Sequence, residues 1–161
     1  MPTQWVEPDD MENMAGTKLP ASDWMVVEQE RINTFADCTE DHQFIHIVEE
    51  AAAKTPFVGT IAHGFLTLSL LTKLSSENSI GVKGVVMGVN YGIDKLRFLA
   101  PVRAGKRIRA HTEVLSVDRK DANRFLVKTG VTVEIEGEET PALYAERLGM
   151  QFIAESEPTS R

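Results

Sequence analysis

The sequence predicts an α+β domain in which one antiparallel β-sheet wraps around a long central α-helix. Residues 63–74 are apolar on nearly every helical face, so a helix there must be buried on most sides. After Gly84 the pattern changes to alternation of apolar and polar residues, which is typical of half-buried strands. The segments between these strands are too short for the crossovers that parallel strands need, so antiparallel pairing is favoured.

Length and composition indicate a single soluble domain. The 161 residues are 42% hydrophobic and 25% charged, and no apolar run reaches the ~18 residues that a membrane span needs. The formal net charge of -7 argues against nucleic acid as a partner. Cys38 is the one cysteine, so no intrachain disulfide forms, and residues 1–31 lack the pattern of a secretory signal. We therefore expect a cytoplasmic protein that has no membrane partner.

The chain divides into three parts in this interpretation. Residues 1–22 are rich in acidic residues, Pro and Met without periodicity, which favours an N-terminal arm or irregular lead-in. Residues 23–155 form the domain, and 156–161 are a C-terminal tail.

The first half of the domain is predicted to be mainly helical. Residues 24–27 fit a short strand, and 29–36 place apolar side chains at helical spacing. A polar turn then leads to His46, and residues 47–54 fit a short helix that ends before Pro56. The long helix begins at His63.

The second half is predicted to consist of strands. Turn residues separate them near Pro101, at 119–123 and at 136–138. The positions that share a face are Leu96 and Phe98, then Ile108, Ala110, Thr112 and Val114, then Val131, Val133 and Ile135, and finally Leu148, Met150 and Phe152.

Asp41 and His46 are candidate catalytic residues because they lie five positions apart in the polar turn. Outside a continuous helix, a carboxylate and an imidazole at this spacing can converge on one water as general base and acid. Gly64 follows at the start of the apolar helix, where free backbone amides can stabilise a developing oxyanion. Simpler roles remain open: Asp41 as a turn or cap residue, His46 as a structural histidine, and Gly64 as a site of close packing.

Three blocks of the sequence, 35–46, 59–67 and 89–102, resemble the MaoC-like dehydratases, in particular the nodulation-protein-N-like branch. The resemblance covers about residues 24–152. It implies a hot-dog fold and a homodimer, or a higher homo-oligomer, with substrate tunnels near the subunit interface. It also implies (R)-specific hydration of trans-2-enoyl-CoA, or the reverse dehydration of (3R)-hydroxyacyl-CoA.

The resemblance assigns roles to four residues. It implies that Asp41 and His46 are the active-site pair, that the Gly64 amide polarises the thioester carbonyl, and that Thr72 supplies a hydroxyl from the central helix. Gln43-Phe44 stands where the broader (R)-hydratase pattern has Asn-Pro, which leaves the loop shape and the pocket width open. Thr72 could instead bond back to a helical carbonyl.

Further candidates for substrate binding are Asn90, His63, Lys95 and Arg97. Asn90 could orient a ligand from a strand or be a satisfied polar residue of the sheet, and His63 fits a packed or capping role. Lys95 and Arg97 belong to the densest basic region, with Lys106, Arg107 and Arg109, which could bind coenzyme A phosphates or be a solvated strand face.

We expect no metal and no redox cofactor, with the coenzyme A thioester as substrate. His42 and His46 could imitate a two-histidine metal site only if their stretch were helical. Two other functions remain open, because a hot-dog fold also hosts thioesterases and could serve as a non-catalytic acyl-CoA binding module.

Overall fold

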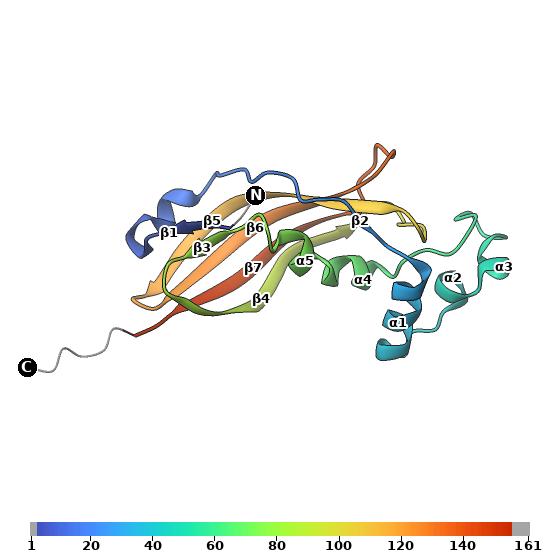
Figure 1. The fold of residues 1–161 in the computed structure, drawn as a ribbon, viewed down its shortest axis with the longest axis horizontal. Coiled ribbons are helices and arrows are strands. Elements are labelled where there is room, and N and C mark those ends of the chain that lie inside the picture. The colour runs from blue at the N-terminus through green and yellow to red at the C-terminus, as the bar shows by residue number, and fades with distance from the viewer. Residues whose placement is uncertain (1–2, 156–161) are drawn as a thin grey trace, which may run out of the picture.

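The computed structural model describes residues 3–155, and the predicted tail at 156–161 lies outside this range. A sheet of long strands forms the body of the molecule, and helices α1 to α3 lie beyond one end of it (Figure 1). The elements in chain order are β1 (Gln4–Val6), the 3-10 helix η1 (Pro8–Met14), β2 (Met25–Val26), α1 (Gln29–Thr39), α2 (Phe44–Ile47), α3 (Glu49–Ala52), α4 (Gly64–Ser69), α5 (Leu71–Ser75), β3 (Ile80–Val82), β4 (Val85–Phe98), β5 (Arg107–Asp121), β6 (Arg124–Ile135) and β7 (Leu143–Ile153).

The main sheet has the strand order β2-β5-β6-β7-β4, and every neighbouring pair is antiparallel. The antiparallel sheet predicted from the alternating pattern is therefore confirmed. Strand β4 lies at one edge, and its pairing with β7 is interrupted by three register shifts. Such bulges bend and twist a strand.

The predicted central helix is present but divided. Helices α4 and α5 are separated by Leu70, although hydrogen bonds still join the two pieces: the Leu70 amide donates to the Leu66 carbonyl at 3.0 Å and the Leu74 amide to the Leu70 carbonyl at 2.9 Å. One side of this helix is buried against the sheet. The other side carries Phe65, which is 65% exposed, so the apolar pattern predicted more burial than this single chain provides.

The core lies between the helix and the inner face of the sheet. Four leucines of the helical region, at positions 66, 70, 71 and 74, pack against strand side chains that include Ile108, Val131, Val133 and Leu143. These four strand residues have no exposed surface. Burying one such side chain stabilises a fold by roughly 1.5–3 kcal/mol, so this contact holds the helix in place.

The N-terminal segment differs from the irregular lead-in that its composition predicts. Strand β1 pairs in parallel with β3, and Met11 of η1 is fully buried in a second core cluster with Val114 and Phe125. A three-residue strand and a single buried methionine leave no periodicity in the sequence, so the pattern could not reveal them.

Within the described range, none of the helices has the length and apolar character needed to cross a bilayer.

Candidate active site

Asp41 lies in the turn that follows α1. The helix ends at Thr39, and the next residue, Glu40, has a φ of 60° in the left-handed region, which turns the chain away from the helix axis. The Gln43 amide lies 3.4 Å from Oδ1 of Asp41, a long contact of the kind that stabilises a turn. The Asp41 side chain is 53% exposed, so the turn presents a solvent-accessible carboxylate.

His46 lies on α2 and is buried. Its Nδ1 is 2.7 Å from the Ile61 carbonyl oxygen, which can only accept, so Nδ1 carries the proton and Nε2 has a free lone pair. Burial lowers the pKa of His46 below its ordinary value of 6.5, and the neighbouring His63 lowers it further, against the raising effects of the Ile61 hydrogen bond and of Asp41. The imidazole is therefore neutral at neutral pH.

His63 packs directly against His46. The two rings are stacked with centroids 3.8 Å apart, and Phe35 contacts His63 at 4.9 Å. Nε2 of His63 donates to the backbone carbonyl of Asp41 at 3.0 Å, and its buried Nδ1 has no partner among residues 3–155. His63 thus joins the turn that bears Asp41 to the ring of His46, which agrees with the packed role considered for it.

The side chains of Asp41, His46 and His63 come close together. One ligand-type atom from each lies within 4.8 Å of the others, a separation that a metal ion could in principle span. However, the two imidazoles are stacked with planes only 24° apart, so one ion cannot lie in the planes of both rings, where their lone pairs lie. His42 is separate, because it precedes α2 and its Nε2 lies 2.9 Å from Asp37.

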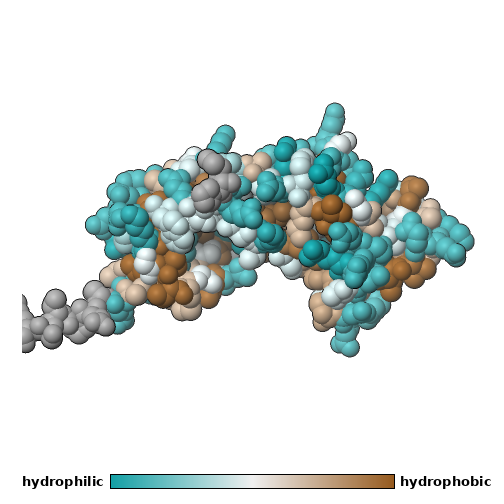
Figure 2. Space-filling view, viewed as in Figure 1, coloured by the Kyte–Doolittle hydropathy of each residue, from teal (hydrophilic) through white to brown (hydrophobic). Residues whose placement is uncertain are grey.

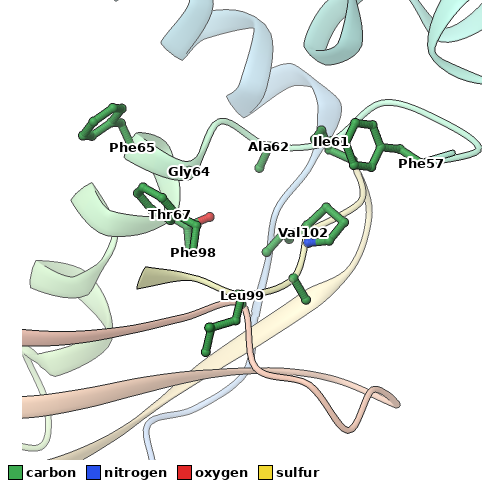
Figure 3. A pocket seen from close by; sticks show the side chains of 12 residues that line it. Phe57, Ile61, Ala62, Gly64, Phe65, Thr67, Phe98, Leu99 and Val102 are labelled. Atoms are coloured by element: carbon green, nitrogen blue, oxygen red, sulfur yellow. The ribbon is translucent and has the colours of Figure 1, made fainter. Parts of the chain in front are cut away.

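Gly64 is the first residue of α4, and no hydrogen bond occupies its amide or that of Phe65 among the described residues. A Cβ at Gly64 would lie 2.9 Å from the ring of Phe98, so any larger residue would have to displace this half-exposed ring. Beside it is a mainly apolar cavity of about 430 Å³. Figure 3 shows Phe65, Phe98 and Val102 around this cavity, which is lined by Gly64 but not by Asp41 or His46.

Three polar residues that sequence reasoning missed hold the active-site segments together. The Gln29 side-chain amide donates to the His46 carbonyl at 2.7 Å, and the Thr60 hydroxyl lies within hydrogen-bonding distance of both Gln29 and Glu49. This network connects α1, α2 and α3 to the strand-like segment before α4. The members of this network are distant in the chain, so the sequence does not show that they meet. The one sequence signal was a threonine, Thr60, in an otherwise apolar stretch, and the structure shows that it is buried.

The remaining sequence candidates lie elsewhere. Thr72 and Asn90 line a second cavity of about 440 Å³ between the central helix and β4. Lys95 and Arg97 are exposed on β4, and no carboxylate of residues 3–155 lies within 4.0 Å of either. The other predicted cations lie on or beside β5, which two strands separate from β4: Arg107 pairs with Glu136 and Arg109 with Glu134, and Lys106 precedes them.

Comparisons with known proteins agree on one family. Residues 10–136 match the model of the MaoC like domain. Nodulation protein N of Rhizobium leguminosarum bv. viciae is 44% identical over 84% of this chain and 85% of its own length. The 3-hydroxyacyl-thioester dehydratase Z of Mycobacterium tuberculosis is 45% identical over 90% of this chain and 95% of its own length.

Solved structures show the same architecture. A monoamine oxidase regulatory protein from Archaeoglobus fulgius superimposes with a TM-score of 0.71, at 29% identity and over 88% of this chain and 92% of that one. The R-hydratase PhaJ1 of Pseudomonas aeruginosa gives a TM-score of 0.66 over 91% of this chain and 92% of its own, at 23% identity.

Proposed function

The chain belongs to the MaoC-like dehydratase family and has its hot-dog fold, and on this premise we propose that it hydrates trans-2-enoyl-CoA with (R)-stereochemistry or catalyses the reverse dehydration. The observation that carries the proposal is the acid and base pair. Asp41 and His46 are brought within 4.8 Å beside the start of α4, with Nε2 of the imidazole free. Relatives named as dehydratases support a hydro-lyase.

In the proposed reaction, Asp41 and His46 bind one water between them. The pair removes a proton as the water oxygen bonds to C3 of the substrate, and the electrons of the C2–C3 double bond shift toward the thioester oxygen. The pair then returns a proton to C2, which completes the addition of water without any net oxidation or reduction. No redox cofactor or metal is part of this proposal, because the step needs only proton transfer and charge stabilisation.

We assign the stabilisation of the thioester oxygen to the free amides at Gly64 and Phe65. These donors lie at the positive end of the helical dipole and beside the apolar cavity that Gly64 lines. Removing one such donor typically costs about 10²–10³ in rate. Lys95 and Arg97, which have no carboxylate partner among residues 3–155, are the proposed contacts for coenzyme A phosphates.

The proposal is tested with crotonyl-CoA, whose enoyl-thioester absorbance disappears on hydration. Asp41→Asn and His46→Gln should each reduce the rate by about 10²–10⁴ while circular dichroism remains native. His42→Gln is the matched control, because His42 is an exposed histidine of the same segment that pairs with Asp37. Full activity in either active-site variant would refute the assigned roles.

The same assay separates the other functions. Release of free coenzyme A, detected with a thiol reagent, would identify a thioesterase. Saturable acyl-CoA binding without turnover over a range of chain lengths would identify a binding module.

We also propose that the protein is a homodimer joined along β4. As the edge strand, β4 leaves backbone groups and several large apolar side chains uncovered, namely Val86, Met87, Val89, Tyr91 and Ile93. Figure 2 shows apolar surface on this side of the molecule. Exposed apolar edges favour association with a further strand, and a second copy of β4 would supply one.

The exposed thiol of Cys38 suits a reducing compartment, in line with the proposed cytoplasmic location.

A further inference from the structure

Arg147 is a charged residue on the core side of the sheet. Along β7 it continues the alternation of Leu143 and Ala145, both of which are fully buried, and it is paired with Thr129 of β6 and with Ile93 of β4. Burial lowers the pKa of Arg147, yet a guanidinium stays protonated in proteins. A positive charge is therefore held between the sheet and the central helix.

This charge has no counter-ion in the described part of the chain. Among residues 3–155, the one side-chain hydrogen bond of Arg147 is from its Nη1 to the Ser75 hydroxyl at 3.4 Å, and no carboxylate lies within 4.0 Å. Four other arginines do have acidic partners: Arg107, Arg109, Arg119 and Arg124. Arg147 is partly buried, and a partly buried charge without a partner is costly, so a bound group of opposite charge would lower the energetic cost of burying it.

The side chain borders a cavity whose lining includes several polar side chains. An inner cavity of about 170 Å³ lies between α5 and the sheet and is lined by Arg147, Ser75, Asn78 and Thr129. Asn78 is only 6% exposed, and its Nδ2 donates to the Ala21 carbonyl at 2.9 Å while its buried Oδ1 has no partner among residues 3–155. The cavity thus offers one cation and one unsatisfied acceptor.

Arg147 also lines a second, larger cavity. It is the residue shared with the cavity of about 440 Å³ that contains Thr72 and Asn90, the sequence candidates for substrate binding. A ligand in the outer cavity between the helix and β4 would therefore lie beside the same guanidinium that lines the cavity of Asn78.

We propose that Arg147 binds a carboxylate in the inner cavity and so selects ligands that carry one. A guanidinium can hold a carboxylate through two parallel hydrogen bonds. A single arginine balances the one negative charge of a carboxylate, but not the net charge of a phosphate group, which is about −2. Asn78 Oδ1 would accept a hydrogen bond from a hydroxyl of the ligand or from a water molecule bound beside it. Where the ligand is an acyl chain, the inference rests on the proposed function, and the preferred substrate is an enoyl-CoA whose far end carries a carboxylate.

The test compares two substrates of matched shape, a trans-2-enoyl-CoA ending in a carboxylate and one ending in an isopropyl group. The native protein should have a higher kcat/KM for the substrate that ends in a carboxylate than for the one that ends in an isopropyl group. The quantity to compare is the ratio of these two kcat/KM values. Arg147→Met should lower that ratio by about 10- to 100-fold, as expected for the loss of hydrogen bonds to a charged group, without lowering turnover of the neutral substrate. Arg124→Met is the control, because this arginine is exposed and paired with Asp121. An unchanged ratio in Arg147→Met would overturn the proposal for substrates.

A second variant and a binding measurement keep the result independent of catalysis. Ser75→Asp would place a carboxylate beside Arg147 as an internal counter-ion, and it should raise thermal stability and abolish the carboxylate preference. Glutarate should raise the melting temperature of the native protein but not of Arg147→Met or Ser75→Asp. If no enoyl-CoA is hydrated, the proposed function fails and the glutarate measurement alone decides. Equal stabilisation of the native protein and Arg147→Met, or none of either, would refute a carboxylate site.

Discussion

At the scale of single residues, the arrangement around His46 defines which ring nitrogen can react. The Ile61 carbonyl fixes the proton on Nδ1, while the stacked ring of His63 covers one face of the imidazole. The carboxylate of Asp41 stays exposed beside it. In the proposed reaction, this leaves Nε2 of His46 and the Asp41 oxygens as the two groups that a water can reach.

The lowered pKa of His46 predicts a pH dependence of stability. Between that lowered pKa and 6.5, the unfolded chain binds a proton that the folded protein does not, so the free energy of unfolding should fall as pH drops through 6.5 and level off below the folded pKa. His46→Gln should flatten this part of the curve, and His42→Gln should leave it unchanged. Urea unfolding at pH values on both sides of 6.5 measures the difference, and parallel curves for all three proteins would contradict it.

Asp41 and His46 could be selected from the sequence because they are close in the chain and the family resemblance points to them. The position of His63 against His46 could not be selected in this way, since it depends on how residues 41 and 63 meet in three dimensions. The same holds for Gln29 and Thr60. Arg147 gave no signal, because an arginine in an alternating strand is expected to face solvent.

At the scale of elements, the N-terminal segment is part of the core through η1. Met11→Ala should lower the free energy of unfolding by about 2–5 kcal/mol, because it removes a fully buried side chain and leaves a cavity between η1 and the sheet. The substitution Asn13→Ala on the exposed side of the same helix is the control and should change it by less than about 0.5 kcal/mol. Chemical denaturation measures both. Equal, small effects would mean that the segment contributes little to stability.

The strands could be predicted more reliably than the helix. Alternation in β5 and β6 depends on local geometry, and it correctly placed Ile108, Val131 and Val133 on the buried face. The division of the helix at Leu70 leaves no mark in an apolar sequence. The exposure of β4 was equally invisible, because an apolar side chain that a second chain would cover has the same pattern as one covered by its own chain.

At the scale of the whole molecule, the two edges of the sheet differ. Strand β2 at one edge has two residues, whereas β4 at the other has fourteen and carries the exposed apolar side chains. Short edges resist association and long apolar edges promote it. This asymmetry supports one interface between two copies rather than an open chain of subunits.

The dimer proposal is tested by introducing a charge at each edge. Val89→Glu on β4 should raise the dimer dissociation constant by about 100-fold or more, because an unpaired charge would be buried in the interface. Val26→Glu on β2 is the matched control, since Val26 is also partly exposed but lies at the opposite edge. Analytical ultracentrifugation should show a native dimer, a largely monomeric Val89→Glu and a dimeric Val26→Glu. A native monomer, or a dimer in all three proteins, would refute the proposal.

The strand order has a consequence for how the chain is made. Strands β5, β6 and β7 follow one another in both sequence and space, so each can pair as soon as the next is synthesised. Strand β4 precedes them in the chain but pairs with β7. Phe98 therefore cannot pair with Leu143 until all of β5 and β6 has been synthesised. Closing this long loop is slow compared with forming the hairpins. During translation, the strand with the most exposed apolar surface is therefore the last to find its neighbour, and the nascent chain is most prone to aggregation in that interval.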